Sequence, residues 1–179
     1  YYGALKGIYN PQENHFVQDA LSRGYKLGII ASGDSHNGHP GRRDPGALTA
    51  GLMGVYAEEL TRESIWKALQ ERSVYATSGA RIIINFHVNS KTMGQIIPVD
   101  GEHVVRDIAG SVIGTDVIKE VTIIKNGSTL YVEKGQGREM AISFRDKTPV
   151  KAGDYYYLRA VQEDDEIAWS SPVWLELRQ

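Results

Sequence analysis

The chain has 179 residues, of which 41% are hydrophobic and 23% charged, and its formal net charge is −2. This composition is typical of a soluble globular protein of one large or two small domains. A net charge near zero gives no reason to expect nucleic acid or a membrane as a partner. The sequence has no cysteine, which excludes disulfides and thiolate ligands, and no apolar run approaches the roughly 20 residues that span a bilayer.

The first third of the chain predicts a helix followed by a buried strand. Residues 10–13 (Asn-Pro-Gln-Glu) combine an N-cap, a proline at the first helical position and a capping-box glutamate, and Gly24 is placed to end the helix. The short apolar run at residues 27–31 is typical of a strand buried on both faces. The chain begins at Tyr1 and not at methionine, so we expect a processed product, a remnant or a piece of a longer chain.

The next elements continue this alternation. A strand is predicted at residues 51–57, a helix capped by Thr61 follows, and a further strand is predicted at residues 73–77. The helix is expected to turn four side chains inward, namely Ile65, Trp66, Ala68 and Leu69. The order of helices and strands is that of βα repeats, but an eight-stranded barrel would need more of them. Residues 1–80 are therefore predicted to form the C-terminal part of a larger α/β barrel. The predicted fold class of the whole chain is an α/β segment followed by a β domain.

From residue 81 the hydrophobic period changes to two. Ile82, Ile84, Phe86 and Val88 alternate with polar or exposed positions, and Asn126-Gly127 is a strong signal for a tight hairpin. About seven short strands with regular turn signals predict an antiparallel, Ig-like β-sandwich. Residues 81–179 are therefore predicted to form a second domain.

The loop after the apolar run carries the side chains best suited to metal binding or catalysis. Asp34 and His36 lie two residues apart where the predicted strand ends, and His39, Arg42 and Arg43 follow. Carboxylate and imidazole are ligands that suit Zn, Mn or Fe, and loops at strand ends hold the chemistry of parallel sheets. Aspartate and serine after glycine are also ordinary turn formers, so the pattern by itself leaves a simple surface loop open.

Two segments together resemble the PHP (polymerase and histidinol phosphatase) superfamily of metal-dependent phosphoesterases. They run from Phe16 through the Gly-Asp-Ser-His-Asn-Gly-His-Pro-Gly stretch at 33–41, and from Gly51 through Ile82. The resemblance implies a distorted barrel with two or three metal ions, and its last metal motif maps onto Asp34 and His36. The family's other ligands would lie before Tyr1. The implied function is a fragment of an enzyme that hydrolyses a small phosphate ester with metal-activated water, inactive alone.

In that implied mechanism the divalent ions, Zn, Mn or Fe, lower the pKa of a bound water and polarise a phosphoryl oxygen. Arg42 and Arg43 are candidate phosphate contacts because guanidinium matches phosphate bidentately, and His39 is a candidate further ligand or proton donor. A solvated loop is the competing interpretation for all three residues. No residue of this chain is assigned a catalytic role.

The alternative function is a non-catalytic β-sandwich module that binds a glycan or a protein, or simply braces a neighbouring domain. A structural role is favoured for several other chemically suggestive groups. Glu58 and Glu59 are expected to favour the helix N-terminus, and Thr77 and Ser78 to form a strand-end turn. Packing is expected for the aromatic group Tyr155, Tyr156, Tyr157, Trp169 and Trp174. A truncated α/β half would leave open strand edges and apolar faces. We therefore expect residues 1–80 either to self-associate or to pack differently on the sandwich.

Overall fold

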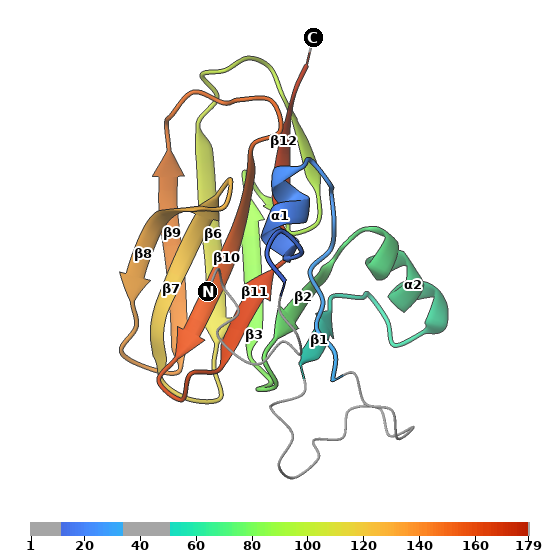
Figure 1. Cartoon of the computed structure of the whole chain (residues 1–179), viewed down its shortest axis with the longest axis vertical. Helices are drawn as coiled ribbons and strands as arrows, with labels where there is room; N and C mark the ends of the chain where they lie inside the picture. The colour runs from blue at the N-terminus through green and yellow to red at the C-terminus, as the bar shows by residue number, and fades with distance from the viewer. Residues whose placement is uncertain (1–11, 34–50, 179) are drawn as a thin grey trace.

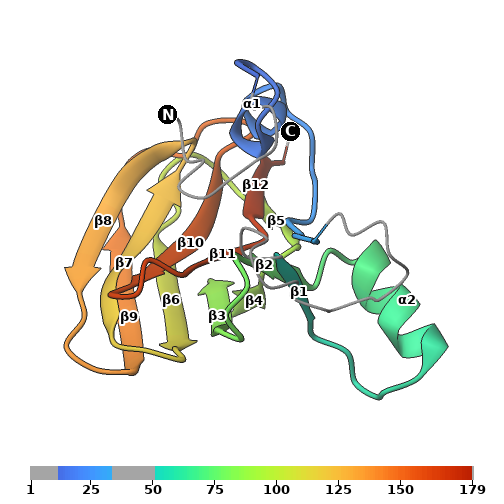
Figure 2. The same cartoon turned by 60° about the horizontal axis from the view of Figure 1, so that its bottom comes forward.

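A computed structural model describes residues 12–33 and 51–178, whose strands form two facing β-sheets (Figures 1 and 2). The larger sheet contains eight strands: β1 (Leu52–Val55), β2 (Val74–Thr77), β5 (Ile96–Val99), β7 (Ile118–Lys125), β8 (Ser128–Lys134), β10 (Tyr155–Gln162), β11 (Ile167–Ser170) and β12 (Val173–Leu177). The smaller sheet has the order β4 (Lys91–Thr92), β3 (Ile83–Val88), β6 (Arg106–Ile113) and β9 (Glu139–Asp146).

Strand β10 organises the larger sheet. Along one edge it pairs with β7, which in turn pairs with β8, and along the other edge it pairs first with β12 and then with β11. From β11 the sheet continues through β2 to β1, whereas β12 pairs in parallel with β5. All the other described strand pairs are antiparallel.

The core lies between the two sheets and follows the period-two pattern of the sequence. Strand β3 turns Ile84, Phe86 and Val88 inward, and β10 turns Leu158 and Ala160 toward them; all five are fully buried. Burial of an aliphatic or aromatic side chain of this size stabilises a fold by roughly 1.5–3 kcal/mol. The tight β7–β8 hairpin is confirmed, because Asn126 and Gly127 both have positive φ, at 50° and 77°.

The α/β part of the predicted fold class is wrong. Strands β1 and β2 are antiparallel, with Leu52 opposite Thr77, and the residues 27–31 belong to no strand. The helix between β1 and β2 therefore does not carry the chain back to a parallel neighbour, and the described residues contain no βα barrel segment. The domain division at residue 80 stays a prediction, and β2 pairs with β11 across it.

Helix α1 (Val17–Ser22) starts later than predicted. Asn14 has a φ of 63°, in the left-handed region, and this breaks a helix that would run from residues 10–13. Instead, the Asp19 carboxylate accepts a hydrogen bond from the backbone N–H of Phe16 at 2.9 Å. The predicted end is confirmed, since Gly24 follows the helix with a φ of 86°.

Helix α2 (Arg62–Gln70) begins where the sequence predicts. Thr61 is extended, and its hydroxyl oxygen accepts a hydrogen bond from the N–H of Ser64 at 3.2 Å. The predicted inward face is confirmed for Ala68, which is buried, whereas Ile65 and Leu69 are half-buried and Trp66 is exposed. Neither α1 nor α2 has the length and apolar character of a membrane-crossing helix.

Candidate functional site

The residues predicted to form the metal and substrate site lie outside the described residues. Asp34, His36, His39, Arg42 and Arg43 all fall within residues 34–50. Their roles, and the Zn, Mn or Fe ions that the resemblance implied, are therefore untested. Among residues 12–33 and 51–178, no group of three or more His, Asp or Glu side chains is arranged to hold a metal ion.

The described residues instead show an uneven distribution of exposed apolar side chains. The four most exposed large hydrophobic residues are Leu60 (95%), Trp66 (62%), Tyr25 (60%) and Ile30 (57%), and all precede residue 80. The most exposed one on the sandwich strands, Ile113, reaches only 46%. Single exposed apolar side chains need no explanation, but a concentration of them on one part of a chain does.

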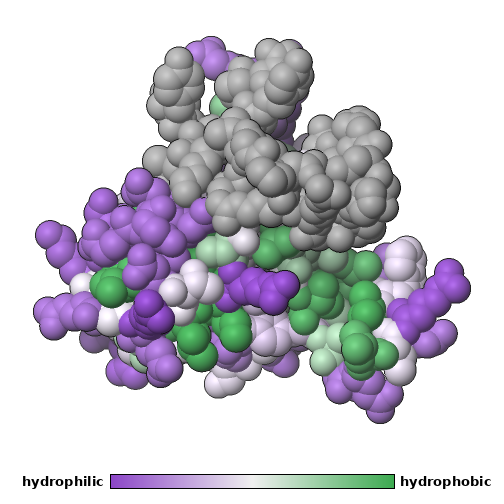
Figure 3. Space-filling view, turned by 90° about the horizontal axis from the view of Figure 1, so that it is seen from below, coloured by the Kyte–Doolittle hydropathy of each residue, from purple (hydrophilic) through white to green (hydrophobic). Residues whose placement is uncertain are grey.

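We call these residues, with two neighbours, the N-terminal apolar surface. It comprises Tyr25, Leu27, Ile30, Met53, Leu60 and Trp66. They come from the segment that descends from α1, from β1, and from α2 with the turn before it, all on the side of the molecule that carries α2 (Figures 1 and 2). Figure 3 shows hydrophobic residues on the underside of the molecule reaching this side.

Helix α2 borders a groove beside this surface. A groove of about 550 Å³ is lined by Arg62, Glu63, Ile65, Trp66 and Leu69. Its floor is apolar, and its rim carries one basic and one acidic side chain. An apolar centre within a polar rim is the ordinary anatomy of a protein–protein interface, and tryptophan is among the residues most enriched at binding hot spots.

The segment after α1 is tied to the larger sheet by polar contacts, among them the ion pair of Lys26 with Glu176 on β12. The N–H of Ile29 donates a hydrogen bond to the hydroxyl of Ser171 at 2.8 Å, and that hydroxyl donates to the carbonyl of Val74. Ile29 is buried, at 8% exposure, whereas Leu27 and Ile30 are 40% and 57% exposed. The predicted two-sided burial of residues 27–31 is therefore wrong for the described structure, in which Leu27 and Ile30 are exposed.

Helix α2 is fixed to the sandwich by the turn that follows it. The guanidinium Nε of Arg72 donates to the carbonyl of Gly94 at 2.9 Å, and the N–H of Gly94 donates to the carbonyl of Pro172 at 2.8 Å. The Arg72 guanidinium also lies 5.6 Å from the ring centroid of Trp174. These contacts hold the turn after α2 against the sandwich and so fix the orientation of the helix.

The suggestive aromatic residues pack in the interior instead of forming a platform. Tyr156 faces the core between the sheets, while the rings of Tyr155 and Tyr157 stack on the outer face of the larger sheet, 6.5 Å apart. Helix α1 covers them with Leu21, and the amide of Gln18 donates to the Tyr157 hydroxyl at 2.9 Å. Exposures of 4% for Tyr155 and 2% for Tyr157 and Trp174 leave no open aromatic face there.

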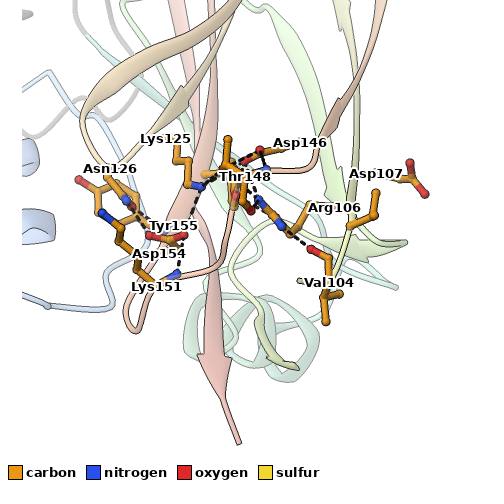
Figure 4. Close-up of polar contacts among 12 residues, drawn as sticks. Val104, Arg106, Asp107, Lys125, Asn126, Asp146, Thr148, Lys151, Asp154 and Tyr155 are labelled. Atoms are coloured by element: carbon orange, nitrogen blue, oxygen red, sulfur yellow. Dashed lines mark hydrogen bonds and ion pairs between the residues drawn. The ribbon is translucent and has the colours of Figure 1, made fainter. Parts of the chain in front are cut away.

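A second feature of the described structure is a cluster of charged side chains at one end of the sandwich (Figure 4). The fully buried Arg106 of β6 lies 2.9 Å from the carboxylate of Asp146, which ends β9. Lys125 at the end of β7 lies 3.1 Å from Asp146 and 3.2 Å from Asp154. The hydroxyl of Tyr156 donates to Asp146 at 2.8 Å and accepts from Arg106 at 3.1 Å. The cluster therefore ties both sheets together.

The surroundings of Asp146 keep it ionised. Burial alone would raise its pKa, but the backbone N–H and hydroxyl of Thr148, each at 2.8 Å, outweigh that effect. Hydrogen bonds from Tyr156 and Arg106 act in the same direction, so the pKa of Asp146 lies well below its ordinary value. With its charges paired and its hydrogen bonds satisfied, the cluster is a structural element that the sequence analysis did not single out.

The strand-end hydroxyls have a structural role. The Ser78 hydroxyl donates to Glu166 and accepts from the N–H of Ile167, which joins β2 to the start of β11. Thr77 is buried and accepts from the N–H of Gly79. The carboxylate of Glu58 lies 3.3 Å from the ammonium group of Lys67, and Lys67 is on α2. The structural interpretation of these residues thus agrees with their described contacts.

Comparison with known proteins gives a match over part of the chain to a family model other than the one that the sequence resembled. Residues 42–116 match the model of DUF3604, described as a protein of unknown function. The description of this model does not name the PHP superfamily, and the described fold contains no barrel segment. The PHP resemblance is therefore wrong, and with it the hydrolase and PHP metal-binding assignments lose their support.

The chain is also similar to longer chlamydial proteins. It is 34% identical over 178 residues to an uncharacterized protein of Chlamydia trachomatis serovar D and 33% identical to one of Chlamydia muridarum. Each match covers 90% of this chain and 29% of the relative, so the chain spans less than a third of their length.

Among solved structures, the similar ones are small β domains. The CARDB domain of a Pyrococcus furiosus protein has a TM-score of 0.36 at 16% identity, covering 55% of this chain and 97% of that one. Fibronectin(III)-like modules of Clostridium thermocellum CbhA have a TM-score of 0.32 at 14% identity, covering 51% and 92%. Such low TM-scores add nothing to what the strand pairing already shows: the described chain is mostly a β-sandwich, and its matching family has no assigned function.

Proposed function

We propose that this chain is a β-sandwich interaction module that binds a protein through its N-terminal apolar surface. The observation that carries the proposal is the exposure of Leu60 and Trp66, at 95% and 62%, beside the groove on α2. Burying apolar area contributes about 25 cal/mol per Å², so covering these side chains favours association. The sandwich provides a rigid base for that contact.

A protein ligand fits this surface better than a glycan. The group Tyr155, Tyr157 and Trp174 offers no platform for a sugar, because α1 and neighbouring side chains cover it. The exposed Trp66 lines the groove together with the aliphatic side chains of Ile65 and Leu69. The groove is lined by aliphatic and aromatic side chains with one charge of each sign. That combination matches the apolar centre and polar rim of a protein interface.

The proposal is tested with the isolated chain, whose surface then has only a second copy to bind. We expect the weight-average mass to rise above 19.8 kDa with concentration in sedimentation or light scattering. Trp66→Glu places a charge on the groove and should restore the monomer mass. The matched control is Ile83→Glu on β3, which is 45% exposed and lies away from α2, and it should associate like the wild type.

The contrary outcomes are well defined. A wild-type chain that stays monomeric up to about millimolar concentration, where the association free energy is weaker than roughly 4 kcal/mol, would exclude a second copy as the partner of this surface. Association that Ile83→Glu abolishes and Trp66→Glu leaves intact would place the contact on the smaller sheet instead.

A further inference from the structure

We infer that, in longer proteins that contain a segment like this chain, another part of the same polypeptide covers the N-terminal apolar surface. The inference rests on the proposed function and names its partner. The first support is length: the chlamydial relatives contain this segment as 29% of their chains. More than two thirds of each relative is therefore present at high effective concentration beside the segment.

The second support is the mismatch between pattern and burial at residues 27–31. This run has the continuous apolar character of a strand buried on both faces. The described structure buries Ile29 against β2 and β12 neighbours but leaves Leu27 and Ile30 open. A continuously apolar run in which only Ile29 of the three large side chains is buried indicates that a neighbour of similar chemistry completes the burial.

The third support is that the surface is already formed. Ser171 holds the backbone at Ile29, and Arg72 with Gly94 holds the turn after α2. A preformed surface loses little conformational entropy when it is covered. A rigid apolar surface is what a neighbouring domain packs against within one chain, where no translational freedom is lost on docking.

The charges at the rim favour a protein surface of mixed sign. Arg62 and Glu63 lie side by side at the groove, and Lys67 pairs with Glu58 on the exposed side of α2. Opposite charges in alternation create no field of a single sign. The chemistry therefore fits an apolar patch with scattered acidic and basic groups, and not a polyanion.

The test compares amide hydrogen exchange in the whole C. trachomatis relative with exchange in this chain alone. Protection factors corrected for sequence are measured for peptides aligned with residues 25–31 and 60–70. We expect them to be at least about tenfold higher in the whole relative, because docking suppresses local opening. Peptides aligned with β6 of the smaller sheet serve as the internal control and should agree within about threefold.

A variant of the relative sharpens the comparison. Aspartate at the position aligned with Ile30 should raise exchange of the 25–31 peptide toward that of the isolated chain. Aspartate at the position aligned with Ile83 should leave that peptide protected.

The outcomes separate the inference from the proposed function. Equal protection in the whole relative and the isolated chain overturns the inference. Protection that disappears when the relative is diluted also overturns it, because the occupant is then a second copy, while the proposed function stands. Equal protection together with a strictly monomeric isolated chain overturns both.

Discussion

The charge cluster at one end of the sandwich and the N-terminal apolar surface are opposite arrangements. Around Asp146, ionised side chains are buried and each has partners within hydrogen-bond distance. Around Trp66, apolar side chains are open to solvent without the burial that their chemistry favours. Buried charge persists only when it is fully paired, whereas exposed apolar surface is stabilised when something covers it. The first region is therefore complete within the described chain, and the second is where we expect a partner.

The largest expected effect comes from breaking the charge cluster. Asp146→Ala leaves Arg106 buried without its carboxylate, and we expect a loss of about 3–5 kcal/mol in the free energy of unfolding, measured by urea denaturation. The control is Asp107→Ala, which removes an exposed pair with Arg145 and should cost only ~0–1 kcal/mol. Similar losses for both variants would show that the cluster contributes no more than a surface pair.

Acid removes part of the same contribution without mutation. The folded-state pKa of Asp146 lies below its unfolded value of about 3.9, so its stabilising effect is present above that pH. Stability from this group should fall as the pH drops below about 5 and approaches the folded-state pKa. In Asp146→Asn, the unfolding free energy should depend less steeply on pH in that range. An unchanged slope would mean that other carboxylates carry the acid sensitivity.

The attachment of α2 to the sandwich is tested at Gly94. Gly94 has a φ of 87°, and a Cβ there would collide with the carbonyl of Arg72. Gly94→Ala should therefore cost about 1–3 kcal/mol. Gly101→Ala is the matched control, because its φ is 101° and nothing lies within 4 Å of the added atom. Both variants strain the backbone, so the difference between their losses in the free energy of unfolding measures the close contact at Gly94. Equal losses would show that backbone strain accounts for the whole effect.

The smallest effect is expected at the apolar surface itself. Trp66→Ser should change the free energy of unfolding by no more than about 0.5 kcal/mol, because the side chain is 62% exposed. Trp174→Ala removes a buried tryptophan and should cost about 3–5 kcal/mol in the same urea experiment. A large loss at Trp66 would show that its packing already stabilises the isolated chain.

The sequence predicted the local features that depend on few neighbours. The cap at Thr61, the Asn126-Gly127 turn and the inward alternation of β3 are set by backbone conformation and period, and the structure agrees with all three. What failed depends on distant partners. Antiparallel pairing of β1 with β2 follows from how residues far apart meet, and a helix between two strands is equally compatible with a parallel crossover.

The candidate site was harder to predict for a related reason. The charge cluster joins Arg106, Lys125, Asp146 and Asp154 from separate strands and loops, and no spacing in the sequence brings them together. The apolar surface was visible in the sequence as residues 27–31 and 65–69, but these patterns predict burial without saying by what. The loop chemistry at Asp34 and His36 remains a prediction outside the described residues.

A dilution series followed by backbone amide chemical shifts tests the central claim most directly. As the isolated chain is concentrated, the account predicts shift changes at residues 25–31 and 60–70, with the amides of β6 and β9 unaffected. Changes confined to the smaller sheet, with residues 25–31 and 60–70 unaffected, would contradict the assignment of the N-terminal apolar surface as the binding surface.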